Sequence, residues 1–319
     1  MEPIIEQLLT SDEPSIRYKV RVGVLGEDPE SSGMRALREE IRTSPRVTAL
    51  LSGRTAAGII PGGVYSKWNG AHWTLAVLAD LGYPPGDAAI APLIDQTCAC
   101  WLSDRHITSV QIINGRARRC ASQESNALYA ILTLGFDDER ADRLAEHLLR
   151  WQWPDGGWNC DKNPDASISS FHETWIPVRA LARYAHMRNH DAAREATARA
   201  AEIFLKRRLF RRLRDGNIMA SSFLKLCYPP YWHYTILNGL KVLAEADCIH
   251  DPRCAEALDL LERKRLPDGG FPAEIVYYVT GSDRRTGRSV VSWGGQRAAK
   301  MNPWVTAEAL CVLAAAGRI

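Results

Sequence analysis

Histidines that could transfer protons recur in one sequence pattern, His-x-Thr at the start of an apolar run. Three of the eight histidines follow it, namely His72, His172 and His233. An imidazole is the side chain whose ordinary pKa lies closest to neutral pH, and it is the commonest general acid or base. Glu173 follows His172 directly and would raise the pKa of that imidazole if the two groups lie close together. We expect these residues, with Asp161 as a further carboxylate, to supply acid–base chemistry.

Each His-x-Thr pattern introduces an apolar segment with helical periodicity. Related segments carry Ser125 or Trp304 in place of the histidine, and residues 16–26 form a sixth copy. The equivalent positions are 16, 72, 125, 172, 233 and 304, so neighbouring copies lie 56, 53, 47, 61 and 71 residues apart. We predict that the threonine caps each helix and that Pro177 falls in a first turn. The repeat then explains the threonine and the position of the histidine, but not the choice of imidazole.

Helices with a charged stripe alternate with the apolar ones. Their charges fall on one side at helical spacing, in residues 32–44, 88–104, 138–152, 191–209 and 252–265. Such alternation is typical of a double ring in which inner helices are buried and outer helices are half exposed. We predict an all-α fold, an α/α toroid with about six inner and six outer helices, as a single domain over residues 1–319. The histidine positions would then face one mouth of the ring. An open helical solenoid is the structural alternative.

Composition and charge favour a cytoplasmic protein without a nucleic-acid partner. The 319 residues are 46% hydrophobic and carry a formal net charge of +3, which demands neither nucleic acid nor a membrane. The sequence has no apolar stretch of about 18 residues, and its acidic start lacks the basic-then-apolar order of a signal peptide. Eight scattered cysteines are expected to be mostly buried free thiols in a reducing compartment.

One segment carries a specific family resemblance. Residues 148–158, LLRWQWPDGGW, contain Gln152, Gly156 and Trp158 in the spacing Q-x3-G-x-W, and residues 265–271, RLPDGGF, are a decayed copy. This resembles the QW repeat of the terpene cyclase and protein prenyltransferase superfamily. The resemblance covers roughly residues 16–317 and implies a toroid with an isoprenoid or similar apolar substrate in a central cavity.

The same resemblance also has limits. The Asp-x-Asp-Asp acid motif of protonating cyclases does not occur in this sequence. The acidic pair Asp137 and Asp138 lies between an apolar and a striped helix, where a cap at a helix N-terminus is the expected role. A standard protonation-initiated cyclase is therefore not expected.

The β subunit of protein prenyltransferases suggests a metal site. In GRARRCASQES, residues 115–125, the arginines precede Cys120, and DKNPDASISSFHET, residues 161–174, is similar to the zinc-histidine stretch of that family. The resemblance implies zinc held by Cys120 and His172, with Cys160 or Asp161 as the third ligand. It also implies that Arg116, Arg118 and Arg119 face the anionic head group of a substrate such as a prenyl diphosphate. Arg118 stands where the family has an aspartate.

Aromatic residues gather near the expected mouth and could line a cavity. Candidates for substrate contact are Trp68, Trp73, Trp232, Tyr234 and Trp304. Tryptophan and tyrosine rings suit a prenyl chain or a carbocation, because cation–π attraction contributes about 0.5–2 kcal/mol per contact. The alternative is that these rings pack between helices in the core.

The strongest charge feature is LKRRLFRRLR at residues 205–214. We expect it to end a striped helix, where basic residues complement the helix dipole. A clamp for a diphosphate and peripheral contact with a membrane surface are the alternatives. The interleaved Leu209, Phe210 and Leu213 favour the surface interpretation.

The sequence therefore predicts an enzyme that acts on an isoprenoid or similar apolar substrate. Two alternatives stay open. The first is a zinc-dependent or acid–base enzyme of the lyase or hydrolase type on another substrate, and the second is a toroid that binds a ligand without catalysis.

Overall fold

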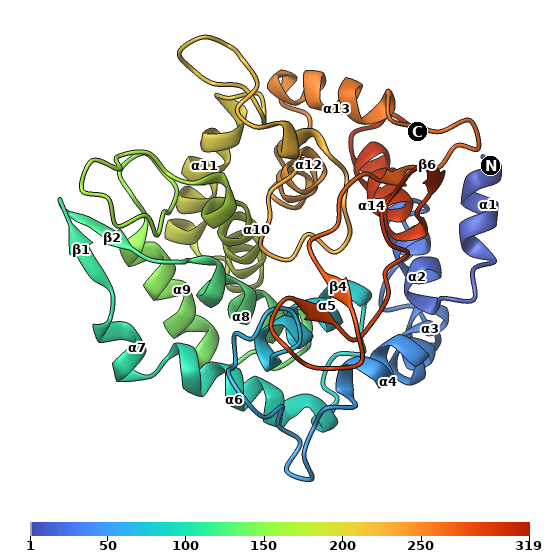
Figure 1. Ribbon diagram of the computed structural model, residues 1–319, viewed down its shortest axis with the longest axis horizontal. Helices are drawn as coiled ribbons and strands as arrows, with labels where there is room; N and C mark the ends of the chain where they lie inside the picture. The colour runs from blue at the N-terminus through green and yellow to red at the C-terminus, as the bar shows by residue number, and fades with distance from the viewer. Residues whose placement is uncertain (1) are drawn as a thin grey trace.

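The computed structural model describes residues 2–319 and shows a mostly helical chain (Figure 1), as predicted. The α-helices are α1 (Pro3–Leu9), α2 (Pro14–Gly23), α3 (Ser32–Thr43), α4 (Pro45–Leu51), α5 (Ala71–Leu81), α6 (Ala91–Trp101), α7 (Asp104–Thr108), α8 (Ser122–Thr133), α9 (Glu139–Trp151), α10 (Phe171–Arg188), α11 (Asp191–Leu205), α12 (Ile236–Glu245), α13 (Ala255–Glu262) and α14 (Pro303–Ala315). Short 3-10 helices occupy Ala88–Ile90, Ser221–Leu224 and Pro252–Cys254.

The strands are short and lie in the connections between helices. They are β1 (Gln111–Ile113), β2 (Arg116–Arg118), β3 (Pro272–Ala273), β4 (Val279–Thr280), β5 (Arg288–Ser289) and β6 (Arg297–Met301). β1 pairs with β2 and β3 with β6 in antiparallel fashion, whereas β4 and β5 run parallel.

The apolar repeat segments form six helices that contact one another in turn. They are α2, α5, α8, α10, α12 and α14; each contacts the next along the chain, and α14 contacts α2. The striped helices α3, α6, α9, α11 and α13 each contact the apolar helix that precedes them. The core lies between these two sets of helices. Most side chains of the apolar helices α5 and α14 are buried in it.

Most of the apolar helices begin earlier than the repeat predicts. The cap prediction is correct for Thr235, whose Oγ1 accepts a hydrogen bond from the Asn238 N–H. It is wrong for Thr74, Thr174 and Thr306, because α5, α10 and α14 begin three residues before them. Asp138 does cap α9, as expected.

His172, Glu173 and Pro177 lie further into α10 than predicted, because this helix begins at Phe171. Pro177 lies beyond the first turn, so the prediction of a first-turn proline is wrong. His172 and Glu173 lie within the first turn, and only His233 stands before its helix. The position of a residue in the helix fixes the direction of its side chain, so this shift matters for the site.

The threonines inside α10 and α14 fasten the two PDGG segments to these helices. Thr174 Oγ1 accepts a hydrogen bond from the Trp158 N–H at 3.2 Å, and Thr306 Oγ1 accepts one from the Phe271 N–H at 2.9 Å. The carbonyl of Trp158 accepts from the Ser170 N–H at 2.9 Å, and the second copy repeats this bond. The two motifs therefore have one shared geometry.

The glutamine and tryptophan of the first copy hold neighbouring helices together. Gln152 Nε2 donates to the Ala196 carbonyl of α11 at 2.8 Å, and Trp158 Nε1 donates to the Leu148 carbonyl of α9 at 3.0 Å. Gly156 has a φ of +107°, and a Cβ there would lie 2.5 Å from the carbonyl oxygen of Arg199. Only glycine fits this turn.

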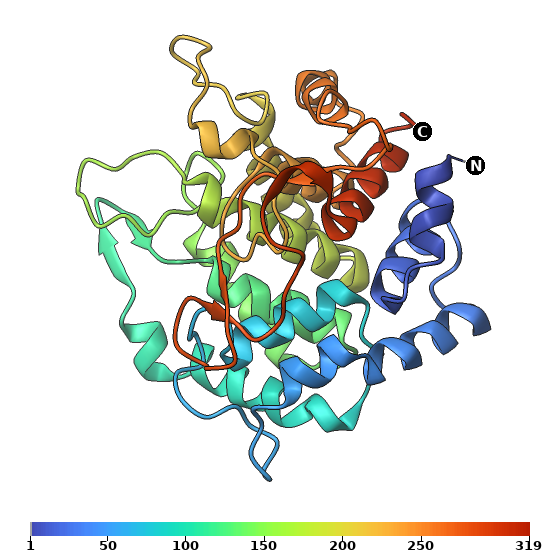
Figure 2. The same cartoon turned by 45° about the vertical axis from the view of Figure 1, so that its right-hand side comes forward.

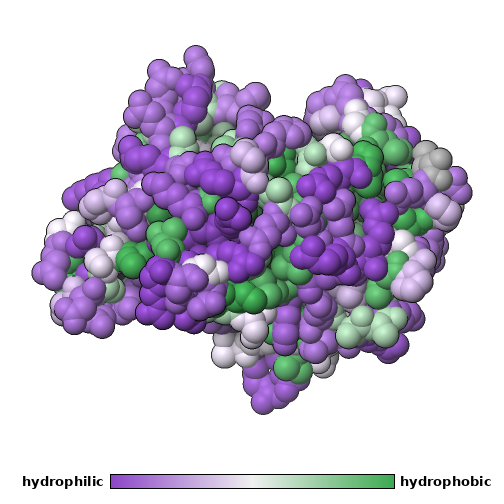
Figure 3. Space-filling view, turned by 90° about the horizontal axis from the view of Figure 1, so that it is seen from above, coloured by the Kyte–Doolittle hydropathy of each residue, from purple (hydrophilic) through white to green (hydrophobic). Residues whose placement is uncertain are grey.

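The face of the molecule that is seen from above is mostly polar (Figure 3). Among residues 2–319, no helix has both the length and the apolar character that crossing a bilayer requires. Seen from above in Figure 3, the surface is largely hydrophilic, with small hydrophobic areas between polar residues. Figure 2 shows the chain between α13 and α14 lying across the inner helices.

We predict that Thr174→Val lowers the free energy of unfolding by about 1–3 kcal/mol, because it leaves the buried Trp158 N–H without an acceptor. Urea denaturation followed by circular dichroism measures this. Thr74→Val is the matched control, since the buried Thr74 Oγ1 has no hydrogen-bond partner among residues 2–319, and it should be neutral or stabilising. Equal losses in both variants would contradict the fastening role.

Candidate functional site

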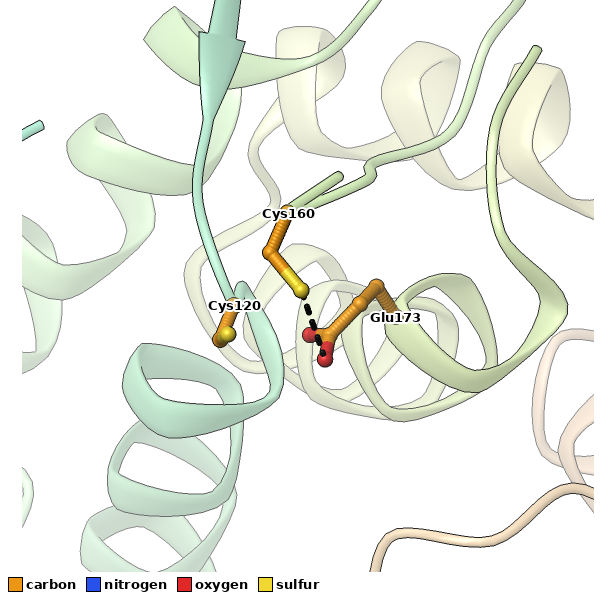
Figure 4. A group of neighbouring side chains, drawn as sticks. All are labelled: Cys120, Cys160 and Glu173. Atoms are coloured by element: carbon orange, nitrogen blue, oxygen red, sulfur yellow. Dashed lines mark hydrogen bonds between the residues drawn. The ribbon is translucent and has the colours of Figure 1, made fainter. Parts of the chain in front are cut away.

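Two thiols and a carboxylate converge at the starts of two neighbouring apolar helices (Figure 4). Within residues 2–319, Cys120, Cys160 and Glu173 are the one group of three or more His, Cys, Asp or Glu side chains whose donor atoms all lie within 4.8 Å of one another. Glu173 is buried and the two cysteines are half-buried. Sequence reasoning paired Cys120 and Cys160 with His172, whereas the structure brings Glu173 to them.

Backbone pairing places the two cysteines side by side. Cys120 lies between β2 and α8, and Cys160 follows the PDGG turn. Arg118 forms a parallel bridge with Asn159, and the Arg119 N–H donates to the Asn159 carbonyl at 3.2 Å. The QW-like motif therefore positions Cys160, and its bond to Thr174 fixes the start of α10, which carries Glu173.

The Glu173 carboxyl is held by three donors. Its Oε1 accepts from Trp232 Nε1 at 2.7 Å and from Cys160 Sγ at 3.8 Å, and its Oε2 accepts from the Ser122 N–H at 3.1 Å. Burial raises the pKa of Glu173, although these hydrogen bonds partly oppose the shift. Glu173 takes part in no ion pair with the residues that the structure describes.

The two thiols are unequal. The two sulfur atoms lie within 4.8 Å of each other, and their interaction raises the pKa of Cys120 and lowers that of Cys160. Burial and the nearby Glu173 raise the pKa of Cys120 further. Cys160 is thus the thiol that ionises first.

This donor set fits a thiolate-binding metal such as zinc. Thiolates are soft ligands that zinc prefers, and catalytic zinc sites use three protein ligands and leave a fourth position open. A divalent cation would also supply the positive charge that the buried carboxylate and the two thiols lack. His172 is not part of the group, and Asp161 is exposed, with its Oδ1 accepting from the Asn163 N–H at 2.9 Å.

His172 and His233 lie near each other on the same side. The ring of His172 stacks on Trp232 with centroids 4.6 Å apart, and its Nδ1 accepts from the Tyr234 N–H at 2.9 Å. The His233 ring lies 6.2 Å from it and stacks on Tyr277 at 3.4 Å. Burial lowers the pKa of both, that of His233 to about 4. Both rings are therefore neutral at pH 7, and because Nδ1 of His172 accepts the Tyr234 N–H, the ring proton of His172 lies on Nε2.

His72 has a different environment. It is fully buried, with its Nδ1 accepting from Trp101 Nε1 at 3.2 Å and its Nε2 lying 3.3 Å from the Asn126 amide. Burial lowers its pKa to about 3. Both ring nitrogens are occupied by neighbouring helices, which is the arrangement of a neutral packing histidine.

The three arginines before Cys120 contact protein groups. Arg118 is buried, donates to the Ala166 carbonyl at 2.9 Å and lies over the Trp153 ring, which Arg116 also approaches. Arg119 forms an ion pair with the buried Glu124 at 2.7 Å. These contacts hold the β1–β2 hairpin and the start of α8 in place.

The aromatic candidates divide into two sets. Trp68 stacks on Tyr231 with centroids 4.3 Å apart and meets Trp73 edge-on at 4.8 Å. Trp73 lines a cavity on the axis of the inner helices, and Trp232 holds Glu173. The other set, Tyr234 and Trp304, is packed in the core, where Tyr234 donates to the Leu209 carbonyl and Trp304 stacks on Tyr228.

Sequence reasoning missed a polar cluster on this axis, which we call the axial ring. Each of the six apolar helices contributes one side chain: Lys19 from α2, Asp80 from α5, Tyr129 from α8, Arg179 from α10, Lys241 from α12 and Glu308 from α14. All of them except Lys19 also line the cavity that Trp73 faces, so the ring forms its floor.

Ion pairs connect the members of the axial ring. Lys19 lies 3.0 Å from Asp80 and 2.5 Å from Glu308, and Lys241 lies 2.8 Å and 2.6 Å from the same two carboxylates. Arg179 donates to the Tyr129 hydroxyl at 2.8 Å and to Glu245, a further residue of α12. The three cations therefore face three carboxylates.

The signal for this ring was present in the sequence. Asp80 and Glu308 are the only Asp, Glu, Lys or Arg residues in the otherwise apolar α5 and α14. Single charges in fully buried helices require partners. Their partners lie on helices far away in the sequence, so no local pattern reveals them.

Comparison with known proteins adds no assignment. No protein-family model matches this chain, and no curated protein matches it.

We predict that Asp80→Asn lowers the free energy of unfolding by about 2–4 kcal/mol, because it leaves the half-buried Lys19 and Lys241 with less negative charge. Chemical denaturation at pH 7 checks this. Asp95→Asn removes an exposed carboxylate that pairs with Arg140 and should cost at most about 1 kcal/mol. Similar costs for the two would refute the central role of the ring.

We predict that stability falls with acid partly through His72. Its pKa is about 6.5 when unfolded and about 3 when folded. Between these values the unfolded chain binds the extra proton, so the free energy of unfolding decreases as the pH falls. His72→Gln should make this decrease shallower by up to about 1.4 kcal/mol per pH unit. The exposed His250→Gln is the control, and parallel stability curves for His72→Gln and wild type would contradict the prediction.

Proposed function

We propose that this protein is an α/α-toroid enzyme that binds zinc through Cys120, Cys160 and Glu173 and acts on an isoprenoid or similar apolar substrate. The observation that carries the proposal is the convergence of these three side chains within 4.8 Å. The cyclic order of contacts from α2 through α14 and back supports the toroid. Eight cysteines present as free thiols support a cytoplasmic location.

The residues around the thiols have separable roles in this proposal. Zinc, when bound, would act as a Lewis acid and lower the pKa of a thiol or water at its open position. Cys120, Cys160 and Glu173 would hold it, and Trp232 would orient Glu173 through the 2.7 Å hydrogen bond. His172, stacked on the same indole and with its Nδ1 accepting from the Tyr234 N–H, would present its Nε2–H to the substrate as a hydrogen-bond donor.

Apolar substrate binding is supported by the walls of the axial cavity. Trp73, Trp175 and Tyr231 line it, and aromatic faces stabilise apolar chains and cationic intermediates. The axial ring closes the cavity at its other end, which confines a substrate to the side of the helix starts. This arrangement favours a short or folded chain over one that runs along the whole axis.

The same cavity also supports a second candidate function. Asn126, Asn238, Arg179 and Lys241 line it together with the aromatic rings. These groups would suit a small polar substrate, so we also propose zinc-dependent or acid–base chemistry of the lyase or hydrolase type.

We predict that the purified protein binds about one zinc ion per chain. Cys120→Ala, Cys160→Ala and Glu173→Gln should each weaken zinc binding by about tenfold or more, because a three-ligand site loses one donor. Metal analysis and competition with a chromogenic chelator measure this. Cys100→Ala is the matched control, since this half-buried thiol lies outside the group.

Zinc binding that is absent from the wild-type protein, or unchanged in Cys120→Ala, would refute the metal site. The substrate class is tested separately with zinc-loaded protein and farnesyl diphosphate or farnesol. Turnover of either supports the isoprenoid proposal, and failure of both to bind contradicts it without affecting the zinc result.

A further inference from the structure

The connection between α11 and α12 begins with a strongly basic hairpin, residues 205–218. It carries Lys206, Arg207, Arg208, Arg211, Arg212 and Arg214, against Asp215 as its single acidic residue. The run was expected to end a helix, but α11 ends at Leu205, so the basic residues lie in the hairpin itself. Figures 1 and 2 both show this segment projecting beyond the ends of the neighbouring helices.

Neighbouring acids neutralise only part of this charge. Arg211 pairs with Glu256 of α13, and Arg208 lies 3.9 Å from the same carboxylate. Arg214 pairs with Asp215 at 3.0 Å. Lys206 lies 3.9 Å from Glu202, which also pairs with Arg253. The hairpin therefore keeps an excess of positive charge at its exposed end.

The tip of the hairpin combines this charge with exposed aliphatic side chains. Residues 212–218 are all exposed, and the turn is closed by hydrogen bonds between Arg212 and Asn217 and between Gly216 and Arg212. Leu213 is 61% exposed and Ile218 is 44% exposed. Leu209 and Phe210, which precede the tip, are buried and anchor it.

We propose that the basic hairpin binds the surface of a membrane that contains anionic lipids, with Leu213 and Ile218 entering the headgroup region. Lys and Arg side chains near such a surface are attracted by its negative potential, and the attraction is screened within a Debye length. Two aliphatic side chains that flank the charges add an apolar contribution that salt does not screen.

The chemistry of the tip favours lipid over nucleic acid. Its exposed side chains include no aromatic ring on which a base could stack, and its two large apolar side chains have no role against a phosphate backbone. The inference concerns a surface outside the thiol group and the axial cavity, so it does not depend on the proposed function.

The test uses the full chain and sedimentation with lipid vesicles. Wild-type protein should bind vesicles of phosphatidylcholine with about 30 mol% phosphatidylglycerol and should not bind phosphatidylcholine alone. Arg212→Glu with Arg214→Glu should weaken this binding by about tenfold or more at low salt. Leu213→Ser with Ile218→Ser should retain low-salt binding but lose the part that resists higher salt.

The matched control is Arg35→Glu with Arg105→Glu, which changes the net charge equally at two exposed positions elsewhere. This variant should bind anionic vesicles as wild type does. An equal loss in the control, an absence of wild-type binding to anionic vesicles, or tighter binding to a DNA duplex than to vesicles would each overturn the proposal. Circular dichroism of each variant shows that the fold is retained.

Discussion

The pairing of buried charges on the axis constrains the whole helical assembly. Lys19, Asp80, Lys241 and Glu308 come from four different helices, and they are shielded from solvent: Glu308 is buried and the other three are half-buried. An unpaired charge there would cost several kcal/mol, so each helix must present its side chain at the same level and toward the same axis. This requirement fixes the rotation and the height of the inner helices relative to one another. The neighbouring cations hold the pKa of Asp80 well below its usual range despite burial, so the pairs stay charged at neutral pH.

The axial ring and the candidate site residues lie at different levels of the apolar helices. Its members lie beyond the helix starts, whereas the thiols, Glu173 and His172 lie at the starts themselves. The PDGG turn, fastened by Thr174, brings Cys160 to the start of α10, and the bridge from Asn159 to Arg118 brings Cys120 beside it. The candidate site residues therefore lie on loops and first turns, which the paired helices support.

The helices were predictable from the sequence because apolar periodicity and charged stripes are local signals. The two cysteines were also predictable, since both lie next to recognisable motifs. The identity of the third group was not, because it depends on where α10 begins. Adjacent residues on a helix point about 100° apart, so once the helix starts at Phe171, Glu173 faces the thiols and His172 faces Trp232. The axial ring could not be predicted, because its ion pairs join residues that are far apart in the sequence, such as Lys19 and Glu308.

Trp232 links the two kinds of chemistry that the first turn of α10 offers. Its indole N–H donates to Glu173 Oε1, and the face of the same ring stacks on His172. A movement of this single side chain would change the orientation of the carboxylate and the environment of the imidazole together. Metal binding at Glu173 and hydrogen bonding by His172 would therefore be coupled through Trp232, the partner that both residues share. That coupling gives a physical reason why Glu173 and His172 occur together at this helix start.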